Sequence, residues 1–131
     1  MIGKYDEYER MFKAERRLWW YRILHQKVTE RIRKHFPNRT DVSILDAGCG
    51  TGGLLMHLRD SGFKQMEGFD FSQDGVAFSK SRGLDITHHD LTKFAQYRPD
   101  RTFDVIVCDD VFTYFSDEVI AELFLGFRGL L

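Results

Sequence analysis

A glycine-rich turn that directly follows an apolar run most constrains the fold of this chain. Residues 42–46 are mostly β-branched and aliphatic, and residues 47–53 then read Ala-Gly-Cys-Gly-Thr-Gly-Gly. Leucines at helical spacing follow in residues 54–58. Glycine lets the backbone turn sharply and approach a ligand where a Cβ atom would collide. Strand, glycine turn and helix in this order predict a ligand-binding turn at the edge of a sheet.

The alternation of strand and helix continues downstream. Further strands are expected over 65–70, 84–89 and 103–108, a helix over 72–82, a helical turn within 90–96, and a final helix from Ser116. Because helical segments separate the strands, the connections should be right-handed crossovers and the strands parallel, with helices on both faces. The predicted class is α/β with a doubly wound parallel sheet of four strands.

A long helical segment precedes this sheet. Residues 5–36 contain neither proline nor glycine and carry apolar side chains at helical spacing, which predicts one long helix or two in tandem. Residues 1–39 hold 11 Lys or Arg and 5 Asp or Glu, whereas residues 40–131 hold 8 and 15. We interpret residues 1–39 as a helical segment that packs on the domain and exposes a basic face, and residues 40–131 as the ligand-binding domain.

The glycine turn alone is compatible with two kinds of ligand. Gly48, Gly50 and Gly53 match the pattern of dinucleotide sites. Asp70, 22 residues beyond Gly48, ends the next strand, where a carboxylate would bind two ribose hydroxyls. Asp46, however, stands two residues before the first glycine, where a carboxylate would repel a pyrophosphate and attract a cationic amino or sulfonium group. A cationic ligand therefore fits better.

More carboxylates follow the third and fourth strands. Asp90 follows the third strand, where it could accept a hydrogen bond from an adenine amino group while the N–H of Leu91 donates to the ring. Asp109 and Asp110 follow the fourth strand. Open α/β sheets bind ligands at the carboxyl ends of their strands. The sequence therefore predicts an acidic crevice at that edge.

Four segments, 46–52, 69–72, 89–91 and 103–111, resemble in this order the signature segments of class I S-adenosylmethionine-dependent methyltransferases. The resemblance implies a Rossmann-like sheet, with S-adenosylmethionine as cofactor and S-adenosylhomocysteine as product. The residues it assigns to cofactor binding are Asp46, Gly48, Cys49, Gly50, Gly52, Asp70, Phe71, Asp90, Leu91 and Asp109. None of these makes or breaks the transferred bond, so the resemblance identifies no catalytic residue.

The resemblance also implies a role for each part of this set. Residues 48–52 would cradle the methionine and ribose, Asp70 would hold the ribose hydroxyls, and Phe71 would lie against the adenine. Asp46 would act on the amino end of the cofactor, and the backbone near Asp109 would border the methionine arm.

The chain of 131 residues suits one domain, whereas the sheet of that family has seven strands. Four strands are found here, so we expect residues 40–131 to be a partial domain without the C-terminal strands. Their absence would expose residues 105–107 as an apolar edge. This predicts self-association through the fourth strand or the last helix.

The expected function is that of a methyltransferase acting on a small-molecule acceptor. An NAD(P)-binding oxidoreductase module and a non-catalytic S-adenosylmethionine-binding module are the alternatives. The two cysteines, which lack metal-ligand spacing, and an N-terminus without an apolar leader indicate a reducing, cytoplasmic setting. The longest apolar stretch, residues 119–131, is too short to span a bilayer, and nucleic acid is a disfavoured partner.

Overall fold

Four parallel strands form one sheet in a computed structural model that describes residues 4–17, 19–97 and 100–108. The strands are β1 (Ser43–Ala47), β2 (Gln65–Asp70), β3 (Ile86–His88) and β4 (Val105–Val107). Their order in the sheet is β3-β2-β1-β4, so the chain adds strands first on one side of β1 and then on the other. All three pairings are parallel, which confirms the predicted parallel sheet.

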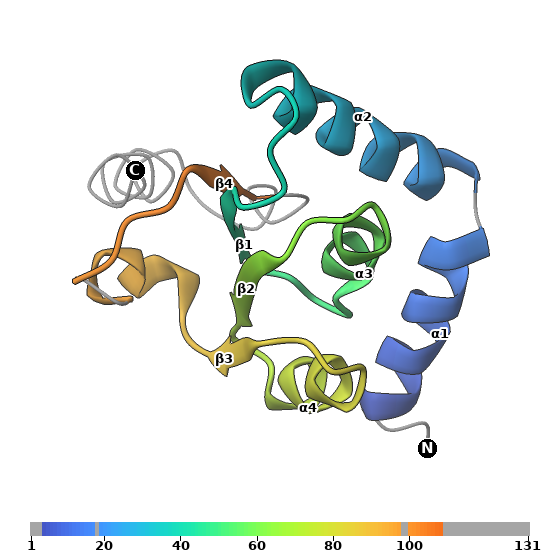
Figure 1. Cartoon of the computed structure of the whole chain (residues 1–131). Coiled ribbons are helices and arrows are strands. Elements are labelled where there is room, and N and C mark those ends of the chain that lie inside the picture. The colour runs from blue at the N-terminus through green and yellow to red at the C-terminus, as the bar shows by residue number, and fades with distance from the viewer. Residues whose placement is uncertain (1–3, 18, 98–99, 109–131) are drawn as a thin grey trace.

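Helices cover the sheet in a layered arrangement (Figure 1). The helices are α1 (Lys4–Arg17), α2 (Trp19–His35), α3 (Gly53–Asp60), α4 (Gln73–Ser81) and η1 (Leu91–Gln96), a 3₁₀ segment that is kinked at Lys93. The four α-helices lie on one side of the sheet, and η1 lies on the other. The N-terminal segment thus forms two helices in tandem, with α1 packed on α4 and α2 packed on α3. Among the described residues, no helix is long and apolar enough to cross a membrane.

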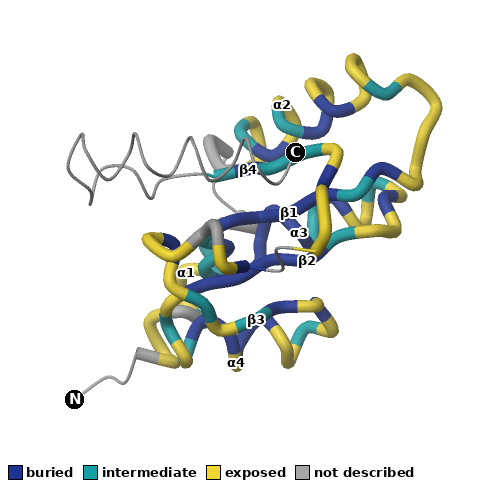
Figure 2. The backbone as a smooth tube through the Cα atoms, turned by 90° about the vertical axis from the view of Figure 1, so that its left-hand side faces the viewer, coloured by how far each residue is buried: buried dark blue, intermediate teal, exposed yellow. Residues whose placement is uncertain are grey.

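Two apolar clusters fill the two faces of the sheet. Strand residues alternate between faces, so neighbours in sequence belong to different clusters. Ile44 packs with α2 and α3, whereas Leu45 packs with Phe69 and with Leu91 of η1. Both strand residues are fully buried, and β1 and β2 form the dark, buried centre of Figure 2. The central strands are therefore covered on both faces, as in other parallel sheets.

The third and fourth strands are shorter than the ranges 84–89 and 103–108 that the sequence predicts. Asp85 still accepts the N–H of Gly68 through its carbonyl, and the N–H of Asp104 donates to the carbonyl of Ser43. One backbone hydrogen bond therefore extends each strand pairing by a residue before β3 and before β4 begin. The helix predicted from Ser116 lies outside the described residues.

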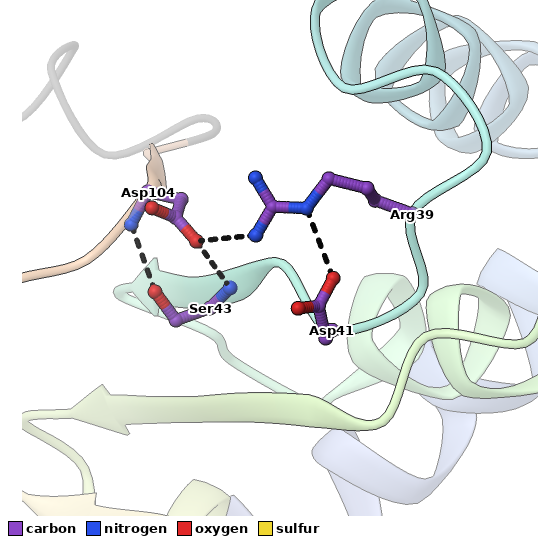
Figure 3. Close-up of polar contacts among 4 residues, drawn as sticks. All are labelled: Arg39, Asp41, Ser43 and Asp104. Carbon is purple, nitrogen blue, oxygen red and sulfur yellow. Dashed lines mark hydrogen bonds and ion pairs between the residues drawn. The ribbon is translucent and has the colours of Figure 1, made fainter.

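A polar cluster joins β1 to β4 at the amino ends of these strands (Figure 3). The Asp104 carboxylate accepts the N–H of Ser43 at 3.0 Å, and the N–H of Asp104 donates to the Ser43 hydroxyl at 2.9 Å. Arg39 donates to Asp41 at 3.0 Å and forms an ion pair with Asp104 at 4.0 Å. The hydrogen bond from Arg39 lowers the pKa of the Asp41 carboxyl. We call these four residues the amino-end clamp.

Candidate functional site

The glycine turn lies over the carboxyl ends of β1 and β2. Gly48, Gly50 and Gly52 have φ values of 77°, 57° and 82°, in the left-handed region that favours glycine. The N–H groups of Gly48 and Cys49 both donate to the carbonyl of Phe69 at 2.9 Å. These bonds hold the turn against the end of β2, next to Asp70.

Two glycines of the turn are required for different reasons. A Cβ atom on Gly52 would overlap the side chain of Leu84 and come within 3.2 Å of the Ser79 hydroxyl, so this glycine serves packing. A Cβ atom on Gly50 would meet no atom within 4 Å. Gly50 therefore borders open space at the carboxyl edge of the sheet, and we call this open space the cradle.

Asp70 connects the glycine turn to the start of α4. One carboxylate oxygen, Oδ2, accepts the N–H of Gly50 at 2.8 Å, and the other, Oδ1, accepts the N–H of Ser72 at 2.9 Å. Ser72 in turn caps α4, because its hydroxyl accepts the N–H of Gly75. Each carboxylate oxygen has two lone pairs, so Asp70 keeps acceptor capacity for ligand hydroxyls.

The residue after Asp70 is the most exposed large apolar side chain described in the chain. Phe71 is 74% exposed, at the carboxyl end of β2. An exposed aromatic ring beside a buried carboxylate offers a flat apolar surface next to hydrogen-bond acceptors.

Asp90 and Leu91 lie at the adjacent strand end. The N–H of His89 donates to the carbonyl of Asp70 at 3.0 Å, which ties this segment to β2. Asp90 accepts the N–H and the hydroxyl of Thr92 on the same oxygen, Oδ1, at 2.9 and 2.8 Å. The bond from the Thr92 hydroxyl, followed by that from its N–H, lowers the pKa of Asp90. The Leu91 side chain is buried in the core, so only its backbone could face a ligand.

Asp46, just before the glycine turn, and Cys49, within it, are both buried. Asp46 is 3% exposed and Cys49 is 9% exposed. Burial raises the pKa of the Cys49 thiol well above its ordinary value, and the charges of Asp46 and Asp70 add to this effect. The thiol is therefore protonated and unsuited to act as a nucleophile. Of the predicted binding residues, Asp109 lies outside the described residues.

Gly68 was missed by the sequence analysis. A Cβ atom on Gly68 would lie 3.0 Å from the carbonyl oxygen of Asp46 and 3.1 Å from the Cys49 side chain. Glycine at this point of β2 therefore lets β1 and the glycine turn pack closely against the strand. A single glycine inside a strand pattern signals such a close approach.

The site offers hydrogen-bond acceptors and the open cradle at Gly50. Among the described residues, no group of three or more His, Cys, Asp or Glu side chains could hold a metal ion. The carboxylates of Asp46, Asp70 and Asp90 gather at three neighbouring strand ends. This arrangement favours a ligand with hydroxyl and amino donors and positive charge over a pyrophosphate.

Comparison with known proteins decides the family. The model of a methyltransferase domain family matches residues 16–124. The chain belongs to this methyltransferase family. The match includes the glycine turn and the strand ends that carry Asp70 and Asp90.

Two curated relatives and one solved structure are similar to this chain. A dTDP-3-amino-3,6-dideoxy-alpha-D-glucopyranose N,N-dimethyltransferase from Streptomyces fradiae is 38% identical over 79 residues, 59% of this chain and 29% of the relative. A ubiquinone biosynthesis O-methyltransferase from Rickettsia canadensis is 27% identical over 109 residues, 71% of this chain and 45% of the relative. The structure of CalS10 with bound SAM, an amino pentose methyltransferase from Micromonospora echinaspora, aligns with a TM-score of 0.73 at 22% identity.

This alignment with CalS10 covers 100% of the chain and 52% of the solved structure. The likeness confirms the Rossmann-like methyltransferase fold. The chain spans less than half the length of the two curated relatives.

Proposed function

We propose that this chain binds S-adenosylmethionine at the carboxyl ends of β1, β2 and β3 and belongs to an enzyme that methylates a small molecule. The observation that carries the proposal is the open cradle at Gly50 beside the buried carboxylate of Asp70. Membership of a methyltransferase family supports the choice of ligand.

The described residues fit the parts of this cofactor. Asp70 would accept hydrogen bonds from the two ribose hydroxyls, and the exposed ring of Phe71 would lie against the adenine. The Oδ2 atom of Asp90, which accepts no bond from the described residues, would accept from the adenine amino group while the Leu91 N–H donates to the ring. Asp46 would favour the cationic amino end.

The cofactor supplies an activated methyl group on a sulfonium sulfur. The task left to the protein is to hold this donor in line with the acceptor and to exclude water, because alignment alone lowers the barrier of such a displacement. Cys49, Gly48 and Gly52 would contribute the shape of the turn around the methionine arm rather than chemical groups. The backbone near Asp109 would border the same arm.

The acceptor is proposed as a small molecule because the two curated relatives act, by their names, on a nucleotide-linked amino sugar and in ubiquinone biosynthesis. The family match argues against the NAD(P)-binding module that the glycine spacing left open. We place the protein in the cytoplasm, since its two cysteines, Cys49 and Cys108, form no disulfide with each other. Nucleic acid remains a disfavoured partner.

Self-association is proposed through the outer edge of β4, the last strand of the described sheet. Val105 and Ile106 on this strand are only partly buried. Sedimentation equilibrium should show a concentration-dependent dimer, and a monomer over the whole concentration range would contradict this part of the proposal.

Titration calorimetry of the chain with S-adenosylhomocysteine and, separately, with NAD tests the proposal. We expect saturable binding of S-adenosylhomocysteine and no heat from NAD. Heat from NAD alone would overturn the assignment. A methyl-transfer assay with S-adenosylmethionine and an amino-sugar nucleotide distinguishes an enzyme from a non-catalytic binding module, which would bind the cofactor without releasing S-adenosylhomocysteine.

A further inference from the structure

A buried carboxylate lies under η1, apart from the residues assigned to the ligand. Glu67, in the middle of β2, is 4% exposed. Its Oε2 accepts the hydroxyl of Tyr97 at 2.5 Å, and its Oε1 accepts a guanidinium N–H of Arg101 at 2.5 Å. Burying an ionised carboxylate is costly unless it is paired and hydrogen-bonded. Tyr97 and Arg101 therefore each give one oxygen of this buried carboxyl group a hydrogen-bond donor.

Tyr97 connects Glu67 to η1. It is the first residue after that helix and is 3% exposed. The centroid of its ring lies 4.7 Å from that of Phe69 and 5.3 Å from that of His89. The His89 ring meets Phe69 edge to face at 5.3 Å, and its Nε2 lies 2.9 Å from the carbonyl oxygen of Lys93. The three rings form one cluster between β2 and η1.

Asp90 and Leu91 stand between these anchored residues. His89 precedes them and is hydrogen-bonded through its N–H to Asp70. The Leu91 side chain packs in the same apolar cluster as Phe69 and Tyr97. Thr92 occupies Oδ1 of Asp90, so the direction of Oδ2 depends on where and how η1 begins.

We propose that Glu67 acts through Tyr97 as a positioning residue that sets the specificity of the site for the adenine base. The inference rests on the proposed function, because it assigns the base to Asp90 and Leu91. A hydroxyl bond to a carboxylate is short and directional, so it holds the Tyr97 ring against His89, the residue before Asp90, more closely than the ring packing and the apolar contacts of Leu91 do. Without it, Asp90 Oδ2 and the Leu91 N–H lose their alignment with the base.

The test compares two ligands that differ only at the base. S-Adenosylhomocysteine carries an amino group, and S-inosylhomocysteine carries an oxygen in its place. A site that hydrogen-bonds the amino group rejects the analogue that lacks it. We expect the unaltered chain to bind S-adenosylhomocysteine at least tenfold more tightly. Tyr97→Phe keeps the ring packing and removes the bond to Glu67, and we expect the preference to fall below threefold.

Two further variants separate positioning from general destabilisation. Glu67→Gln keeps an acceptor for the Tyr97 hydroxyl and should retain most of the preference. Asp104→Asn weakens the distant amino-end clamp and should leave the preference unchanged. Equal weakening of both ligands by Tyr97→Phe, with the preference intact, would overturn the inference. If the unaltered chain binds neither ligand, the proposed function fails and this inference fails with it. If the unaltered chain binds both equally, the assignment of the base to Asp90 fails.

Discussion

The two ends of the sheet use the same side chain, aspartate, for different purposes. At the amino ends, Asp41 and Asp104 face the guanidinium of Arg39 and the N–H of Ser43, so the chain supplies its own countercharge. At the carboxyl ends, Asp70 accepts hydrogen bonds from two backbone N–H groups. These donors are neutral, so they orient the carboxylate without supplying a countercharge. Under the proposed function, the partner of a carboxylate, rather than its presence, distinguishes a structural contact from a binding site.

Replacing Asp70 with Asn should have the largest effect on binding. The variant loses the charged acceptor for two ribose hydroxyls, and hydrogen bonds to charged groups contribute about 1.5–3 kcal/mol each. We expect the Kd for S-adenosylhomocysteine to rise on the order of 100-fold, measured by calorimetry. An unchanged Kd would show that Asp70 serves only to hold the glycine turn.

Asp104→Asn is the matched change at the opposite end. Asp104 is partly exposed, and such contacts are typically worth up to about 1 kcal/mol. We expect a small decrease in the free energy of unfolding, measured by urea denaturation, and no change in the affinity for S-adenosylhomocysteine. A large loss of affinity would mean that the two ends are coupled.

Gly50→Ala tests the open cradle. An alanine in the left-handed region costs roughly 1–2 kcal/mol, and its Cβ atom would enter the space assigned to the cofactor. We expect at least tenfold weaker binding of S-adenosylhomocysteine. Gly62→Ala is the control, because Gly62 also has a positive φ and open space around it but lies beyond the end of α3. Similar losses of affinity in the two variants would refute the cradle.

The end of β2 and the glycine turn could be predicted from sequence because their signals are local. The spacing of Gly48, Gly50 and Gly52 and the position of Asp70 after an apolar run required no knowledge of packing. Glu67 and Gly68 could not be found in this way. Glu67 meets Tyr97 and Arg101, 30 and 34 residues away, and Gly68 is needed because β1 and the turn approach it in space.

Cys49 offers a test of burial at the site. Only the thiolate reacts with iodoacetamide, and burial raises the pKa of Cys49, so the native thiol should stay neutral even at pH 8.5, about the ordinary pKa of a free thiol. In a Cys108→Ser variant we expect alkylation, followed by mass spectrometry, to be many-fold slower in the native than in the urea-unfolded chain. Rapid native labelling would show that the turn opens readily.

An NMR titration of the ¹⁵N-labelled chain with S-adenosylhomocysteine tests the central comparison most directly. The account predicts amide shifts at Gly48, Gly50, Ser72 and Leu91, around the carboxyl ends of the strands, and none at Ser43 or Asp104 in the amino-end clamp. Shifts confined to the clamp, or no shifts at the glycine turn at saturating ligand, would contradict it.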